Sequence, residues 1–243
     1  PVLMKFLRKA AMILPTSRPY LDTSPVLAEV RDRCRVVPLG ILPEAFAAPP
    51  AERIEALRAQ YGGAFVLFAG KHRYYKGLPY LIEAARDIRA PLVIAGDGPE
   101  REGIMAMARE SGINAFFPGE LAQADLVAHL HACALVVFPS IQRSEAFGIA
   151  ILEAHACCKP VVATKLGTGV EYANEHGTTG LNVPPRDPEA LSRAVNELLA
   201  DPERRRQWGA YARDRVAREF HAEQTARTEY LLYQEALACG TST

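Results

Sequence analysis

Two lysines and two glutamates have the residue types and spacing for chemistry on a phosphorylated ligand. Lys71 and Lys76 lie in a loop bounded by glycines, and Glu145 and Glu153 lie eight positions apart. Ammonium groups bind anions such as a diphosphate, and carboxylates accept hydrogen bonds from sugar hydroxyls. Gly148 lets a ligand approach the first N–H groups of the helix that follows it, a natural anion site. A solvated rim with turn glycines is the alternative that composition alone leaves open.

Short apolar runs alternate with segments of helical periodicity from about residue 64 onward. Each run is about five residues long and apolar on both faces, as expected for strands of a parallel sheet covered by helices on both sides. This alternation predicts an α/β fold with a doubly wound parallel sheet. The expected strands are 65–69, 91–95, 113–117, 134–138 and 160–164, and the expected helices are 78–87, 100–111, 124–132 and 148–157. Residues 188 to about 238 are expected to be helical, with a new helix beginning at 201–202 and a break at 220–222.

Three polar loops that contain glycine follow three of these strand runs. They span residues 70–77, 96–99 and 140–148, and the helix after the third carries Glu153. Because open parallel sheets bind ligands at the carboxyl ends of their strands, we expect the three loops to meet at one edge.

Both ends of the chain depart from this alternation. Residues 1–50 contain eight prolines and one strand-like run, residues 34–38. We therefore expect residues 1–40 to be the remnant of an upstream domain and an inter-domain linker. Residues 41–220 form the expected ligand-binding domain, and residues 221–243 a final helix and tail. The final helix carries an apolar stripe of Tyr230, Leu231, Tyr233 and Leu237.

Composition and spacing exclude several classes of function. The 28 basic and 28 acidic side chains balance, so no basic field favours nucleic acid, and no apolar run reaches the length of a membrane span. His129 and His131 are two apart on a helix and point to different faces, which argues against a metal pair. The sequence has no Asp-x-Asp pair to hold a divalent metal. The spacing of the five cysteines, 34, 133, 157, 158 and 239, is not that of a zinc site. We expect most of them to be buried in the protein and reduced, and the compartment to be the cytoplasm.

The order of residues 144–154, Ser-Glu-Ala-Phe-Gly-Ile-Ala-Ile-Leu-Glu-Ala, closely resembles the E-x7-E segment of retaining glycosyltransferases with the GT-B fold, the large family 4 (group 1). Five more segments resemble that family in the same order, and the resemblance covers about residues 34–235. They are residues 37–41, 68–77, 93–99, 159–163 and 176–185. The resemblance implies a Rossmann-like C-terminal domain of the GT-B fold with a helical C-terminal extension.

This resemblance assigns roles to individual residues. It implies that Glu145 lies against the donor sugar and that Glu153 binds the ribose hydroxyls of the nucleotide. Lys76 matches the family's lysine at the diphosphate, whereas Lys71 stands where the family usually has an arginine, and Arg73 is a second candidate cation. The remaining donor-binding candidates are Gly70 and the backbone of Phe147, Gly148 and Ile149.

The implied function is transfer of a hexose from a nucleoside diphosphate sugar to an acceptor with retention, in bacterial surface polysaccharide or glycolipid synthesis. Residues 164–169 resemble sequences in mannosyl- and other transferases that build bacterial surface polysaccharides, which makes GDP-mannose one candidate donor and a UDP-hexose the other. We expect no metal, because lysines take its place at the diphosphate. A non-catalytic nucleotide-sugar-binding domain and a sugar-nucleotide epimerase of the same fold are the alternatives.

The resemblance also implies that this chain is the donor-binding half of a two-domain enzyme. The acceptor, a sugar or a lipid-linked glycan, would then bind largely to a missing N-terminal domain, and the fragment alone is expected to be inactive. In the family the last helix packs on that domain. We therefore expect its apolar stripe here to be partly exposed, or covered by self-association or by residues 1–33; the alternative is a helix that simply packs on its own domain. The expected location is the cytoplasm, with peripheral attachment at the inner face of the membrane as a further option.

Overall fold

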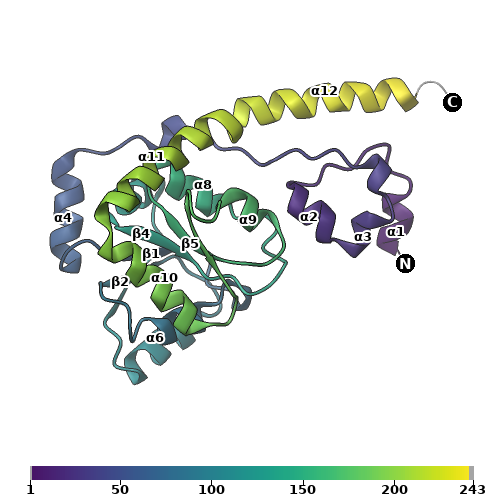
Figure 1. Cartoon of the computed structure of the whole chain (residues 1–243). Helices are drawn as coiled ribbons and strands as arrows, with labels where there is room; N and C mark the ends of the chain where they lie inside the picture. Colours follow the sequence, from purple (N-terminus) through teal and green to yellow (C-terminus); the bar gives the residue numbers. More distant parts are fainter. Residues whose placement is uncertain (1, 241–243) are drawn as a thin grey trace.

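The computed structural model describes residues 2–240, and the side chains of residues 2–238, around a six-stranded parallel sheet (Figure 1). The strands are β1 (Val66–Ala69), β2 (Leu92–Ala95), β3 (Ala115–Gly119), β4 (Leu135–Phe138), β5 (Val161–Thr164) and β6 (Gly180–Val183). Their order is β3-β2-β1-β4-β5-β6, and every pairing is parallel. The chain therefore starts in the middle of the sheet and builds outward in both directions, which confirms the doubly wound α/β prediction.

Helices cover both faces of the sheet, and each face has its own apolar core. On one face lie α5 (Leu78–Ala84), α6 (Arg101–Glu110) and α10 (Pro188–Ala200). On the other lie α4 (Ala51–Tyr61), α7 (Gln123–Ala132), α8 (Ile149–Ala156), α9 (Gly169–Ala173) and α11 (Pro202–Glu219). All residues of β2, β4, β5 and β6 are buried, as expected where both faces are covered.

Three elements of this domain were not predicted from the sequence. Strand β6 contains a polar residue, Asn182, which interrupts the apolar run. Its side chain can be buried because it forms hydrogen bonds with Asn174. Helix α4 buries only Tyr61, so no apolar stripe announces it, and α9 has five residues. Polar side chains thus build parts of the domain that apolar patterning does not reveal.

The prediction of a strand at residues 34–38 is wrong. Cys34 forms only an isolated bridge with Ile13, and the segment runs beside residues 13–15 through the bonds Arg35 N to Ile13 O (2.9 Å) and Val37 N to Pro15 O (3.0 Å). Prolines 15 and 38 lack the N–H groups that would extend this pairing. Short helices dominate instead: α1 (Val2–Leu7), α2 (Arg18–Thr23), α3 (Pro25–Ala28) and the 3-10 turn η1 (Arg31–Arg33), around a small core of their own.

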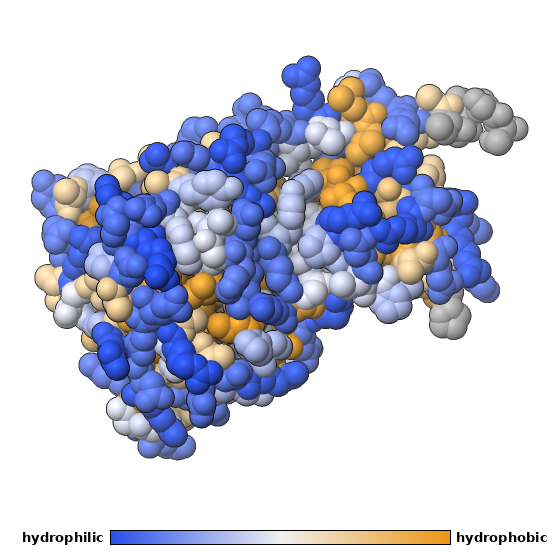
Figure 2. Space-filling model, viewed as in Figure 1, coloured by the Kyte–Doolittle hydropathy of each residue, from blue (hydrophilic) through white to orange (hydrophobic). Residues whose placement is uncertain are grey.

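The final helix, α12 (Ala222–Gly240), extends from the sheet domain past the N-terminal helices (Figure 1). The backbone of Ile41 bonds to Phe220 and Ala222, so the linker and the start of α12 meet at one point. The predicted stripe is exposed, from 57% at Leu231 and Tyr233 to 72% at Leu237. Hydrophobic side chains also show on the surface of this arm in Figure 2. Across residues 2–240 no helix combines the length and apolar character that a bilayer span requires.

Two further 3-10 turns complete the described structure, η2 (Pro43–Phe46) in the linker and η3 (Tyr74–Lys76) in the loop after β1. The second of them matters for the site, because it turns the chain between the two lysines of that loop.

Two helical glycines in opposite environments test the packing of α11. A Cβ at Gly209 would lie 2.0 Å from the carbonyl oxygen of Cys158, whereas a Cβ at Gly103 in α6 would meet nothing within 4 Å. We expect Gly209→Ala to lower the free energy of unfolding by about 1–3 kcal/mol, because α11 must move away from the Cys158 backbone, two residues after α8. Gly103→Ala should raise it by about 0.5–1 kcal/mol through helix propensity. Urea denaturation followed by circular dichroism measures both, and a gain for both variants would contradict the close contact.

Candidate functional site

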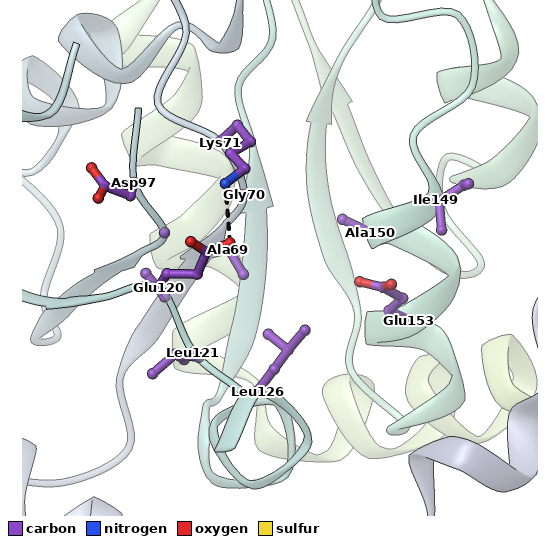
Figure 3. Close-up of a pocket in the computed structure, with 12 residues that line it drawn as sticks. Ala69, Gly70, Lys71, Asp97, Glu120, Leu121, Leu126, Ile149, Ala150 and Glu153 are labelled. Atoms are coloured by element: carbon purple, nitrogen blue, oxygen red, sulfur yellow. Dashed lines mark hydrogen bonds and ion pairs between the residues drawn. The ribbon is translucent and has the colours of Figure 1, made fainter. Parts of the chain in front are cut away.

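Two neighbouring cavities open at the carboxyl edge of the sheet. The first cavity, about 310 Å³, lies between the loops after β1, β2 and β3 and the start of α8 (Figure 3). The second cavity, about 340 Å³, lies beside the loop after β4. Ile149 and Ala150, the first residues of α8, line both. A ligand that spans the two cavities would therefore cross the N-terminus of α8, where N–H groups have no partner inside the helix.

An ion pair between Lys76 and Glu145 lies in the wall of the second cavity. The distance from Lys76 Nζ to Glu145 Oε2 is 2.5 Å, and the side chains are only 13% and 12% exposed. The Ser140 hydroxyl donates to the same carboxylate oxygen at 3.0 Å. The ammonium group also lies 4.8 Å from the centre of the Phe138 ring. Two donors thus fix the Glu145 carboxylate where this cavity begins.

Two glycines allow the loops that carry this ion pair to come together. Gly77 follows Lys76 with φ of 69°, and a Cβ there would lie 2.0 Å from the carbonyl oxygen of Pro139. Gly148 has φ of 87°, and its Cβ would meet the Ile151 and Phe138 side chains at 3.0–3.1 Å. Both positions need the left-handed backbone and the missing side chain of glycine. The loops after β1 and β4 therefore touch, and the lysine reaches the glutamate.

Glu153 enters the first cavity from α8, and no side chain of the described residues forms such a pair with it. Ile149 and Glu153 are four residues apart and so lie on one face of the helix, and Figure 3 shows the Glu153 carboxylate directed from α8 toward the opposite wall. Burial raises the pKa of this carboxyl, with no other contribution. An unpaired, partly dehydrated carboxylate is a strong acceptor for the hydroxyl groups of a ligand.

Lys71 lies on the opposite wall of the first cavity, where its ammonium group pairs with Glu120 at 3.0 Å (Figure 3). The sequence suggested that Lys71 and Lys76 face one diphosphate, but the structure places them in different cavities. Arg73 is exposed on the same loop and lines neither. Gly70 lines the first cavity, whereas Phe147 and Gly148 line the second. The shared wall at α8 is what connects the two groups of predicted residues.

Several lining residues of the two cavities were not named as candidates from the sequence. Asp97 and Glu120 line the first cavity; Asp97 lies in the predicted loop 96–99, two residues after β2, and Glu120 directly follows β3. The same signal that picked out Lys71 applies to both. Thr16 and Leu39 line the second cavity. They come from the N-terminal segment, and no local pattern marks them.

The histidines and cysteines have structural surroundings. His129 Nε2 bonds to the Tyr61 hydroxyl and His131 Nε2 to the Phe46 carbonyl, each at 2.9 Å, so the two rings have different partners. Burial raises the pKa of the Cys133 thiol to about 11. Cys34 and Cys157 are also buried and Cys158 half-buried, all four are free, and the side chain of Cys239 lies outside the described residues. No group of three metal-binding side chains occurs among the described residues.

Comparison with known proteins gives one consistent family. The family model described as glycosyl transferases group 1 matches residues 51–215. D-rhamnosyltransferase WbpZ of Pseudomonas aeruginosa is 38% identical over 91% of this chain and 58% of its own length. O-antigen chain mannosyltransferase C of Escherichia coli is 34% identical over 98% of this chain and 64% of its own length. The chain thus spans about three fifths of the length of these relatives.

Solved structures share the fold. Sucrose-phosphate synthase from Thermosynechococcus elongatus superposes with a TM-score of 0.85 at 28% identity, over 98% of this chain and 61% of that one. HepE from Anabaena, in complex with UDP and glucose, superposes with a TM-score of 0.84 at 21% identity, over 96% of this chain and 66% of that one. At that identity the second likeness concerns the fold alone.

The two glutamates should affect stability in opposite directions. Because burial raises the pKa of Glu153, its charged form destabilises the folded state at neutral pH. We expect Glu153→Gln to raise the free energy of unfolding at pH 7 by up to about 1 kcal/mol. That gain should disappear as the pH falls below the ordinary carboxyl pKa of about 4.3, where both states are protonated.

Glu145→Gln should instead lower the free energy of unfolding by about 1–2 kcal/mol, because it leaves the Lys76 charge without its partner. Chemical denaturation of both variants at pH 4 and pH 7 provides the measurement. Stabilisation by both substitutions would show that Lys76 does not depend on Glu145.

Proposed function

The chain belongs to the group 1 glycosyl transferases, and from this premise we propose that its two adjoining cavities bind a nucleoside diphosphate sugar. The observation that carries the proposal is the shared wall at the N-terminus of α8, with Glu153 in one cavity and the Lys76–Glu145 pair in the other. The nucleoside occupies the first cavity and the hexose the second. The diphosphate crosses Ile149 and Ala150, where helix N–H groups attract anions.

Each charged group then has one task in transfer. Negative charge grows on the diphosphate as the glycosidic bond breaks, while the sugar becomes oxocarbenium-like. The Lys76 ammonium has three N–H donors, so it contacts a phosphate oxygen while it stays paired with Glu145. The fixed Glu145 carboxylate faces the sugar and stabilises its developing positive charge. We assign Glu145 no role as a nucleophile, and we propose retention at the anomeric carbon, as in family 4.

The first cavity suits the nucleoside because of its carboxylates. Glu153 lacks a hydrogen-bond partner and accepts from the ribose hydroxyls, which offsets the cost of its burial. Lys71, paired with Glu120, supplies a second cation at the mouth of this cavity, with Gly70 beside it. Because Lys76 and the N-terminus of α8 serve the diphosphate, with Lys71 as a further cation at the mouth of the first cavity, the proposal includes no metal.

We place this chain as the C-terminal, donor-binding half of a two-domain GT-B enzyme. The length of its relatives supports this, as does the exposed stripe of α12, which suits packing against a further domain. That N-terminal domain supplies most of the acceptor site, so the chain alone performs no transfer, because alignment of donor and acceptor provides much of the rate. Self-association through α12 is the alternative cover for the stripe.

The donor we propose first is GDP-mannose, with UDP-hexoses as the alternative. The name of the E. coli relative, an O-antigen chain mannosyltransferase, supports mannose and an acceptor that is a sugar or lipid-linked glycan of a bacterial surface polysaccharide. Transfer would take place in the cytoplasm, with peripheral attachment at the inner face of the membrane where the acceptor is lipid-linked.

Binding without metal is the direct test of this function. We expect isothermal titration calorimetry to show that the chain binds GDP or UDP in the presence of EDTA. Added magnesium should change the affinity by less than about twofold, because lysines and helix N–H groups neutralise the diphosphate. Binding that is lost in EDTA and restored by magnesium would contradict the proposal.

Glu153 and Glu145 should differ in the ligand that they recognise. Glu153→Ala should weaken the bare nucleoside diphosphate and the sugar nucleotide alike, by about 10–100-fold, as expected for loss of a charged acceptor. Glu145→Ala should weaken the sugar nucleotide more than the bare diphosphate, because it faces the sugar. Glu189→Ala, an exposed glutamate of α10, is the control. Equal losses for both ligands in both variants would remove the separate assignments.

A further inference from the structure

The N-terminal segment and the loop that carries Glu145 meet at one side chain, Arg143. We propose that Arg143 is a positioning residue, which fastens helix α2 to the loop of residues 140–148 and so keeps Thr16 and Glu145 in the wall of one cavity. This inference rests on the proposed function, since the second cavity is where we place the donor sugar. It adds a contribution from the N-terminal segment to the recognition of that sugar.

The guanidinium of Arg143 contacts two other parts of the chain, the loop after β5 and helix α2. Its Nη1 donates to the carbonyl oxygens of Gly167 at 2.7 Å and Leu166 at 3.2 Å, both in the loop after β5. Its Nη2 donates to the Thr23 hydroxyl at the end of α2, at 2.9 Å. The guanidinium carbon lies 5.6 Å from the ring centre of Tyr20, also in α2. The planar fork of an arginine can bridge acceptors on different segments, which the single ammonium of a lysine does less well.

These contacts are those of a connector. None of the ion pairs found among the described residues includes Arg143. Its partners are carbonyl oxygens, a hydroxyl and an aromatic ring. The Thr23 hydroxyl is itself 2.5 Å from the Gly167 carbonyl oxygen, so α2 and the loop after β5 are also bonded directly. The three segments therefore form one unit with Arg143 at its centre.

The loop after β5, which Arg143 contacts, is hydrogen-bonded in turn to the backbone around Glu145. The Thr168 hydroxyl donates to the backbone carbonyl of Glu145 at 2.9 Å, and Gly169 N donates to the carbonyl of Ala146 at 2.8 Å. The Glu171 carboxylate accepts from Gly167 N at 2.7 Å and so stiffens the same loop. Since Arg143 lies two residues before Glu145, the backbone of Glu145 is held from both sides.

The other end of α2 reaches the second cavity. Ser17 is fully buried and caps the helix by accepting from Tyr20 N at 3.2 Å. Thr16, the residue before it, lines the cavity that Lys76 and Glu145 also line. Arg143 thus holds the C-terminal end of α2 while its N-terminal end presents a hydroxyl-bearing residue to the cavity. A polyhydroxylated ligand such as a hexose is what a hydroxyl and a fixed carboxylate recognise together.

The test compares two ligands in each variant. Calorimetry measures the affinities of the bare nucleoside diphosphate, GDP or UDP, and of GDP-mannose or UDP-glucose. For Arg143→Ala we expect the affinity for the sugar nucleotide to fall about tenfold and that for the bare diphosphate to change less than about twofold, because the first cavity is untouched. The ratio of the two affinities also removes the general effect of losing one positive charge near an anionic ligand.

Four further variants separate positioning from a loss of structure. Arg143→Lys should restore the ratio only in part, because the ammonium cannot keep all the contacts of the fork. Thr23→Val should also weaken the sugar nucleotide relative to the bare diphosphate. The double variant Arg143→Ala/Thr23→Val should show no larger effect than Arg143→Ala, because both substitutions remove the same connection. Arg193→Ala, an exposed arginine of α10, is the matched control. If Arg143→Ala does not fold, Thr23→Val carries the test.

The outcomes also separate this inference from the function on which it rests. If the unmodified chain binds no nucleoside diphosphate, the proposed function fails. If it binds both ligands but Arg143→Ala and Arg193→Ala give the same ratio, or Arg143→Ala weakens both ligands equally, the positioning role is wrong and the donor site remains.

Discussion

The ion pair between Lys76 and Glu145 is the interaction on which the arrangement of the site depends. Each of these charges, nearly buried, would be costly alone. Their meeting follows from the strand order, because β1 and β4 are neighbours in the middle of the sheet although the chain passes through β2 and β3 between them. The loops after β1 and β4 lead to opposite halves of the sheet, so a crevice opens between them, as is typical of such a switch point. Gly77 and Gly148 then bring the charged residues together.

The strands of the sheet could be predicted because burial on both faces leaves an uninterrupted apolar run, as in β2 and β4. That signal fails at β6, where Asn182 is satisfied by Asn174, and it misled at residues 34–38, where prolines stop the pairing. The site was predictable as polar loops after strands. The sequence did not reveal that Lys71 and Lys76 line different cavities. The turn η3 ends at Lys76, and only the folded chain shows where each lysine points. Whether these residues bind a donor stays a prediction.

Glu145, in the loop after β4, and Glu153, in the helix α8 that follows it, have different surroundings although they lie close in the sequence. Glu145 already has its counter-charge and a hydroxyl donor, whereas Glu153 is dehydrated without a partner. The free energy that Glu153 costs in the unliganded protein is recovered only by a ligand that donates hydrogen bonds to it. In the function that we propose, ribose recognition and reduced stability would therefore both come from this carboxylate.

Ile41 is the residue at which the linker and the final helix α12 meet the sheet domain. The linker enters the sheet domain there and α12 leaves it there, with backbone bonds from Ile41 N to Phe220 O and from Ala222 N to Ile41 O. Farther along, Arg35 and Glu235 pair at 4.0 Å, so the outgoing helix and the incoming chain also touch beyond the junction. The linker and α12 are therefore joined to each other by backbone hydrogen bonds where they meet the sheet domain. The position of α12 is thereby tied to that of the N-terminal segment, so a partner that packs on α12 also lies next to that segment.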